Sequence, residues 1–220
     1  MPILRPYDSV LSQAYYVHSP TLKSYIARHH KMSTNIDNSN DLTVHRVDSA
    51  EDLELWTPSL VRLLQSCVNI DPASSSIGFR APLSEAKATE YWHSLSAQLY
   101  GSQPNTTLFV LGRGSNAIGT IQLVTHAKET HAHKVEIGKL LVAESDRGRG
   151  LGRKLMNVAE SFAQDNLAKN MVLLDTATES PAREFYLKLG YTEWGICPQY
   201  AASADGHIHE SSFFYKYLSM

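Results

Sequence analysis

The spacing of apolar side chains predicts three amphipathic helices in the chain. Leu53 and Leu64 lie on one apolar stripe behind Ser49, a residue type that often caps the start of a helix. A second helix is predicted over residues 83–99. The third has one apolar face made of Leu151, Leu155, Val158, Ala159 and Phe162.

Apolar runs of strand length alternate with these helices. They cover residues 43–47, 107–111, 118–125, 135–142, 171–175, 191–196 and 213–217. Ser180 followed by Pro181 predicts the start of a further helix that ends at Gly190, because proline suits the first helical position. The alternation of both kinds of element predicts an α/β domain.

The first forty residues do not share this pattern. Residues 32–40 are polar and predict a linker. We therefore divide the chain into an N-terminal extension or arm with its linker, residues 1–40, and a domain over residues 41–220. Met32 could be the native start, and an arm that packs on the domain or on a partner is the alternative.

The composition excludes several functional classes. Hydrophobic residues make up 43% of the 220 residues, and the net charge is -2, which argues against binding to nucleic acid or to anionic membranes. No apolar run is long enough to cross a bilayer, so no membrane partner is expected. The two cysteines, Cys67 and Cys197, are far apart and indicate a reducing, cytoplasmic setting. We expect Cys197 to be a small buried residue.

A loop rich in glycine and arginine precedes the third predicted helix. Its residues are Arg147, Gly148, Arg149, Gly150, Leu151, Gly152 and Arg153. Glycines allow close approach of a ligand to the backbone, and the free N–H groups of a helix start attract phosphate. The third glycine of a dinucleotide motif is replaced by Arg153, and the Gly-Lys-Ser/Thr of a P-loop is absent. A solvated basic turn is the alternative reading.

The spacing of Arg147, Gly150 and Gly152 resembles the pyrophosphate-binding motif of the GNAT superfamily of N-acetyltransferases. Glu136 precedes this motif at the family's spacing, and the segment around Tyr186 resembles the next family block. The resemblance implies a mixed, mostly antiparallel sheet splayed at a cofactor cleft, with helices on both faces. It also implies acetyl-CoA as co-substrate, bound by the loop residues 147–153 and by Leu140, Leu141 and Val142.

The resemblance narrows to the tabtoxin-resistance group of acetyltransferases. It rests on four motifs: GFxxPL from Gly78, Trp92, LDT from Leu174 and YAxxxDG from Tyr200. Within these motifs, Phe79 and Tyr200 are candidates for the wall of a substrate pocket. Many relatives have asparagine where this chain has Glu179, so Ser180 is expected to contact the cofactor instead.

Amine acetylation needs a base for the ammonium proton and an acid for the departing thiolate. Glu136 is the first candidate for the base and Asp175 the second, because both would lie on neighbouring strands at the cleft. Tyr186 is the candidate acid. The alternatives are an outward strand carboxylate for Glu136, a loop-bonding residue for Asp175 and a packing aromatic for Tyr186.

The expected function is acetyl transfer from acetyl-CoA to the primary amine of a small, amino-acid-like molecule or toxin. The transfer would be direct, in a ternary complex, by a monomer or homodimer. The alternatives are acetylation of a protein or peptide amine, and a CoA-binding regulatory module without turnover. His126, His131 and His133 lack other ligands at metal spacing, so no metal is expected.

Overall fold

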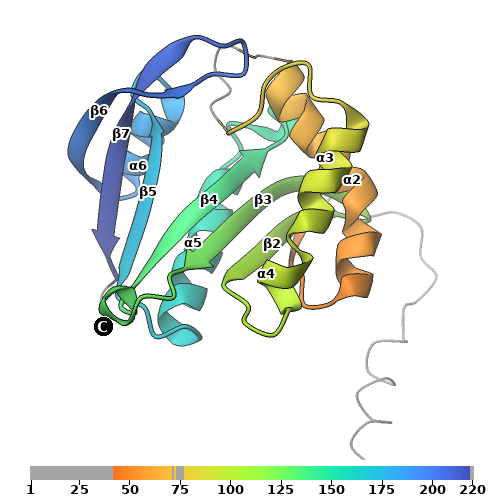
Figure 1. Ribbon diagram of the computed structural model, residues 1–220, viewed down its shortest axis with the longest axis horizontal. Coiled ribbons are helices and arrows are strands. Elements are labelled where there is room, and N and C mark those ends of the chain that lie inside the picture. Colours follow the sequence, from red (N-terminus) through yellow and green to blue (C-terminus); the bar gives the residue numbers. More distant parts are fainter. Residues whose placement is uncertain (1–41, 71, 73–76, 219–220) are drawn as a thin grey trace, which may run out of the picture. The chain divides into compact units, whose positions relative to one another are not determined.

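The computed structural model describes residues 42–70, 72 and 77–218. The proposed arm, its linker and Met32 lie outside these residues. The described chain forms one open sheet of seven strands with helices on both faces, as Figure 1 shows. The mixed α/β class expected from the sequence is therefore confirmed.

The strands follow the spatial order β1-β2-β3-β4-β5-β7-β6. Their bounds are β1 Leu42–Arg46, β2 Thr106–Arg113, β3 Asn116–Thr125, β4 Lys134–Val142, β5 Met171–Ala177, β6 Thr192–Ala202 and β7 Ile208–Tyr217. All neighbouring pairs are antiparallel except β4 and β5, which run parallel. The sheet is thus mostly antiparallel, as the resemblance implied.

The helices are α2 Ala50–Asn69, α3 Glu85–Ser94, α4 Ser96–Tyr100, α5 Leu151–Asp165 and α6 Pro181–Lys188. Ser49 caps α2 by accepting a hydrogen bond from Asp52 N, and Ser180 caps α6 with Pro181 in its first turn, as predicted. The predicted helix over 83–99 is divided at Leu95 into α3 and α4. None of the described helices is long and apolar enough to cross a membrane.

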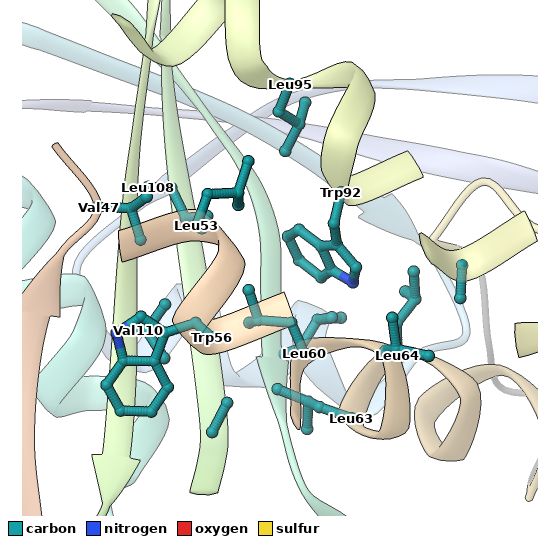
Figure 2. Close-up of a cluster of buried hydrophobic side chains, with 14 of the residues drawn as sticks. Val47, Leu53, Trp56, Leu60, Leu63, Leu64, Trp92, Leu95, Leu108 and Val110 are labelled. Atoms are coloured by element: carbon teal, nitrogen blue, oxygen red, sulfur yellow. The ribbon is translucent and has the colours of Figure 1, made fainter. Parts of the chain in front are cut away.

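Two apolar clusters hold the helices to the sheet. On one face, Trp92 of α3 lies beside Leu60 and Leu64 of α2, and all three side chains are fully buried (Figure 2). On the other face, Leu155 of α5 and Phe214 of β7 belong to the second cluster. Because each face has its own core, the sheet is anchored on both sides and can position a site between its strands.

The pairing between β4 and β5, which joins the two parts of the sheet, is short. Strands β4 and β5 pair at Lys134–Met171, Val135–Val172 and Glu136–Leu173, and no further pair follows along either strand. Figure 1 shows the two strands diverging beyond this short ladder. Backbone groups and side chains of β4 and β5 are therefore exposed to the space between them.

Candidate active site

A cavity of about 860 Å³ opens where β4 and β5 diverge. It is lined by residues 137–142 of β4, by the loop and first turn of α5, by Asp175 and Thr176 of β5, and by the start of α6. Tyr200 and Ala201 of β6 and Cys67 of α2 complete part of the wall. Six elements of the chain thus meet at one cavity.

One end of the cavity is the start of α5. Gly150 precedes the helix with φ 77°, and no side chain caps the first turn. The first turn also contains no acidic residue. A Cβ built on Gly148 or on Gly150 would have no atom within 4 Å, so these backbone positions face open space. The unpaired N–H groups and the positive end of the helix dipole form a site suited to an anion.

Gly152 serves a different purpose in the same loop. A Cβ at this position would lie 3.2 Å from the Phe185 ring of α6. The missing side chain therefore allows α5 and α6 to pack closely beside the anion site. The three glycines of the motif divide into two that open the backbone and one that permits packing.

The arginines of the loop have different positions. Arg147 and Arg153 line the cavity, and Arg147 Nε donates to the Val142 carbonyl at 3.1 Å. Arg149 does not line the cavity; its Nη1 lies 3.4 Å from Asp146 Oδ1, and its side chain is largely exposed. Arg147 and Arg153 are the arginines available to a ligand inside the cavity.

Asp146 was missed by the sequence analysis. Its buried carboxylate accepts a hydrogen bond from Arg113 Nη2 at 2.7 Å and from Ser145 at 3.1 Å. The Arg113 guanidinium lowers the pKa of Asp146 below its usual range. The group ties the glycine loop to β2. Since Arg113 is 33 residues away, local spacing gave no signal for this pair.

The β4 wall includes Leu140, Leu141 and Val142, the residues that the resemblance assigns to the cofactor arm. Ser180 also lines the cavity, while its Oγ accepts a hydrogen bond from Ala182 N at 3.2 Å. This capping bond uses a lone pair of Ser180 and leaves the hydroxyl hydrogen available to a ligand. Capping and ligand contact are therefore compatible at Ser180.

The other end of the cavity carries the candidate base residues. Asp175 lies on the cavity wall, and its pKa is raised first by desolvation within that wall and then by the Glu136 carboxylate. Glu136 is on the last paired position of β4 and does not line the cavity. Its Oε1 lies 3.0 Å from His126 Nε2. The strands bring the two carboxylates near each other, as expected, but only Asp175 faces the cavity.

Tyr186 projects from α6 into the same region. The side chain is only 6% exposed and still contributes to the cavity lining. Burial and the nearby Asp175 carboxylate raise the pKa of Tyr186. The phenol therefore keeps its proton at neutral pH. A protonated hydroxyl next to a cavity carboxylate provides an acid beside a base.

The predicted pocket aromatics are placed differently. Tyr200 lines the cavity. Phe79 does not; its ring packs edge to face on Tyr91 at 5.1 Å. The loop that contains Phe79 is joined to the turn after β6, because Ala81 N donates to the Ala204 carbonyl at 2.9 Å. Two motifs that are far apart in the sequence thus meet at this side of the cavity.

The cysteines differ from the sequence expectation. Cys197 is exposed on β6, so the prediction of a buried residue is wrong. β6 is the edge strand of the sheet, and most of its side chains face outward. Cys67 and Lys139 line the cavity, and sequence reasoning missed both. Their placement depends on the packing of α2 and on a local irregularity of β4.

Comparison with known families agrees with this geometry. Residues 104–193 match the acetyltransferase (GNAT) domain family. Over this range the chain is similar to a GNAT domain. The matched range begins just before β2 and extends into β6, so it contains the glycine loop and both carboxylates. The match to an acetyltransferase domain supports an acyltransferase. Membership of the tabtoxin-resistance group does not follow from the match.

Solved structures of acetyltransferases share the fold of the described chain. A provisionally assigned phosphinothricin N-acetyltransferase is 21% identical, with a TM-score of 0.62 over 82% of this chain and 100% of that one. A provisionally assigned acetyltransferase from Salmonella typhimurium, solved with acetyl-CoA, is 16% identical, with a TM-score of 0.61 over 82% and 96%.

A third relative in fold is a spermidine N-acetyltransferase. The Vibrio cholerae enzyme, solved with CoA and spermine, is 19% identical to this chain. Its TM-score is 0.60, and the match covers 80% of this chain and 95% of that one. At these identities the three structures establish the fold of the domain.

Proposed function

We propose that this acyltransferase moves acetyl from acetyl-CoA to the primary amine of a small molecule. The observation that carries the proposal is one continuous cavity with an uncapped helix start at one end and Asp175 with Tyr186 at the other. The first end suits a pyrophosphate and the second suits proton transfer. The likeness in fold to structures solved with acetyl-CoA and with CoA supports the same assignment.

The pyrophosphate is assigned to the backbone N–H groups from Gly148 to Arg153. Arg147 and Arg153 supply positive charge there, and the open backbone at Gly148 and Gly150 lets phosphate approach closely. The pantetheine arm then follows Leu140 to Val142 along β4, where β4 is no longer paired with β5. This path directs the thioester toward Asp175 and Tyr186.

Asp175 is assigned as the main base for the acceptor. Its raised pKa makes the carboxylate more competent to take the ammonium proton, directly or through water. Glu136 contributes through its charge, because it faces His126 rather than the cavity. The free amine then attacks the thioester carbonyl in a ternary complex. A C–N bond forms, the C–S bond breaks, and Tyr186 gives its proton to the departing sulfur. The proton that the new amide nitrogen loses restores the Tyr186 phenol, directly or through water.

The acceptor is proposed to be a small amine. The cavity is bounded on several sides by Tyr200, Ile77 and Gly78 as well as by the sheet. The fold relative solved with spermine supports a small acceptor. Acetylation of a peptide amine is the second candidate, since the cavity also opens to solvent.

An acetyl-transfer screen tests the proposal. Purified protein is incubated with acetyl-CoA and a panel of amines, amino acids and peptides, and thiol release is followed with time. We expect release to depend on a small primary amine. Acetyl-CoA binding with no thiol release for any acceptor would instead favour a binding module. Release with peptides alone would favour the peptide candidate.

A further inference from the structure

A lysine that the proposed mechanism does not use lies at the acceptor end of the cavity. Lys139 follows Gly138 on β4 and lines the cavity wall. Strand pairing shifts at this point, since Gln122 of β3 opposes Gly138 while Thr120 opposes Leu141. β4 therefore has one extra residue here. Such bulges redirect side chains and are common beside active sites.

The backbone of Lys139 confirms the local irregularity. Its φ is 47°, in the left-handed region that residues other than glycine rarely adopt. The carbonyl of Lys139 accepts a hydrogen bond from Thr120 Oγ1 at 2.8 Å. This bond fixes the bulge, so the direction of the lysine side chain is built into the strand rather than left to a flexible loop.

Two aromatic rings hold the charged end of Lys139. Its Nζ lies 5.7 Å from the ring centroid of Phe79 and 5.7 Å from that of Tyr91. The Tyr91 hydroxyl accepts a hydrogen bond from Gln122 Nε2 at 3.0 Å, which keeps that ring in place. Aromatic faces attract a cation but accept no strong hydrogen bonds. The ammonium is positioned while its N–H groups stay available.

Lys139 has no close anionic partner among the residues that the structure describes. No described carboxylate lies within ion-pair distance of Nζ. Burial lowers the pKa of Lys139, and the more distant Asp175 carboxylate acts in the opposite direction. A partly desolvated cation on a cavity wall is stabilised by an anion that enters the cavity.

We propose that Lys139 binds a carboxylate of the acceptor, so that the preferred acceptor is a small dipolar amine such as an amino acid. The inference rests on the proposed function. Asp175 would receive the ammonium group, and Lys139 would hold the carboxylate of the same molecule. The cofactor phosphates are assigned to Arg147 and Arg153 at the opposite end, which leaves Lys139 to the acceptor.

The arrangement disfavours acceptors that carry only positive charge. A polyamine would bring a second ammonium group toward Lys139 and find no carboxylate there among the described residues. An amino acid matches both charges. Lys139 is thus a specificity-determining residue, and its effect should appear in the choice among acceptors.

Acetyl transfer to L-amino acids, to their methyl esters and to spermidine tests this proposal. Each acceptor is measured with wild type, Lys139→Met, Lys139→Arg and the control Lys87→Met, in which an exposed lysine of α3 outside the cavity is changed. Thiol release gives kcat/KM. The ratio of variant to wild type within each acceptor cancels differences in amine basicity.

We expect wild type to prefer free amino acids. Lys139→Met should lower kcat/KM for them by about ten- to a hundredfold, mainly through KM, because one charge-assisted hydrogen bond is lost. The esters should change little, Lys139→Arg should recover part of the activity, and Lys87→Met should behave as wild type. Acetyl-CoA affinity, measured by calorimetry, should be unchanged in Lys139→Met.

Three results would overturn the inference. Preference of wild type for esters or spermidine would show that no carboxylate is recognised, while leaving amine acetylation intact. An equal loss for acids and esters in Lys139→Met would give the lysine a structural role. Weaker acetyl-CoA binding in that variant would assign the lysine to the cofactor. Absence of thiol release with every amine would refute the proposed function itself.

Discussion

The two ends of the cavity use different chemical groups. At the start of α5, the cavity is lined by open backbone at Gly148 and Gly150 and by arginines. Where β4 and β5 diverge, it has the Asp175 carboxylate and the Tyr186 phenol. The first set can hold charge without exchanging protons at neutral pH, whereas the second can exchange protons. Binding and chemistry are therefore separable by mutation.

The separation is also visible in how helices begin. Ser49 caps α2, whose first turn includes Glu51 and Asp52. Helix α5 has neither a side-chain cap nor an acidic residue in its first turn. The α2 start is satisfied by its own side chains, while the α5 start leaves its N–H groups for a ligand. A ligand takes the place of the cap.

The largest effect is expected from Gly150→Asp. The new carboxylate would face the phosphate position, and loss of two or three charge-assisted hydrogen bonds predicts an affinity for acetyl-CoA about a thousandfold lower. Calorimetry measures this change in acetyl-CoA affinity.

The same method should detect no binding of NAD to the wild-type protein.

Gly114→Asp is the matched control for this variant. Gly114 also has a positive φ, 57°, and open space around its Cβ position, but it lies in the β2–β3 turn and not in the cavity lining. Both variants should stay folded, and the control should bind acetyl-CoA as wild type does. If folded Gly150→Asp bound acetyl-CoA with unchanged affinity, the pyrophosphate could not be assigned to the start of α5.

The next effect concerns the base. Asp175→Asn keeps the side-chain shape and removes the basicity, so kcat/KM near neutral pH should fall by about 100- to 1,000-fold. Because the pKa of Asp175 is raised above the ordinary 3.8, the acidic limb of the wild-type profile should lie above that value. Activity should recover partly at high pH, where more of the amine is free.

Glu136→Gln is the comparison for that profile. Removing its charge should lower the pKa of Asp175, because Glu136 raises it, and shift the acidic limb to lower pH with a smaller loss of rate. A larger loss in Glu136→Gln would make Glu136 the main base, and the pair could titrate as a coupled unit. If both variants kept the wild-type rate and pH profile, neither carboxylate would be the base, and deprotonation by solvent would be the better explanation.

Tyr186→Phe should lower kcat by about a hundredfold with little change in acetyl-CoA affinity. The ring that packs beside Phe214 is kept, and only the proton donor is lost. Presteady-state thiol release and calorimetry separate the two quantities. If Tyr186→Phe turned over at the wild-type rate at every pH, the role of Tyr186 would be limited to packing.

The smallest effect is expected from Asp146→Asn, which weakens the bonds that hold the glycine loop to β2. Weaker bonds to Arg113 should cost about 1–3 kcal/mol of unfolding free energy and lower acetyl-CoA affinity by about tenfold. The pKa of Asp146 is lowered, so its contribution is present above the ordinary 3.8 and is lost as pH falls further. Urea unfolding near pH 7 should separate the variant from wild type, and the difference should shrink as the pH falls below 3.8. A difference that does not shrink with falling pH would contradict this.

Local patterns predicted much of the fold and of the phosphate end of the cavity. Ser49, Ser180 and Pro181 begin helices where their capping chemistry predicted, and the glycine loop precedes α5 as expected. These features depend on neighbours within a few residues. The break at Leu95 was not visible, because the apolar spacing continues through it.

The acceptor end depended on long-range packing. Phe79 does not line the cavity, but its ring contacts Lys139, which does. The Lys139 side chain is directed by a bulge that no spacing rule indicates. Asp146 and Arg113 meet through the packing of the loop on β2. The sequence favoured Glu136 over Asp175 as the base because of the family's spacing. Which of the two carboxylates faces the cavity depends on where β4 and β5 diverge, and this is not encoded in local spacing.

A crystal structure with bound CoA tests the division of the cavity most directly. The account predicts pyrophosphate oxygens within hydrogen-bond distance of the N–H groups from Gly148 to Arg153, and the CoA sulfur beside Tyr186 on the side of Asp175. A pyrophosphate bound away from the start of α5, or a sulfur directed away from the divergence of β4 and β5, would contradict it.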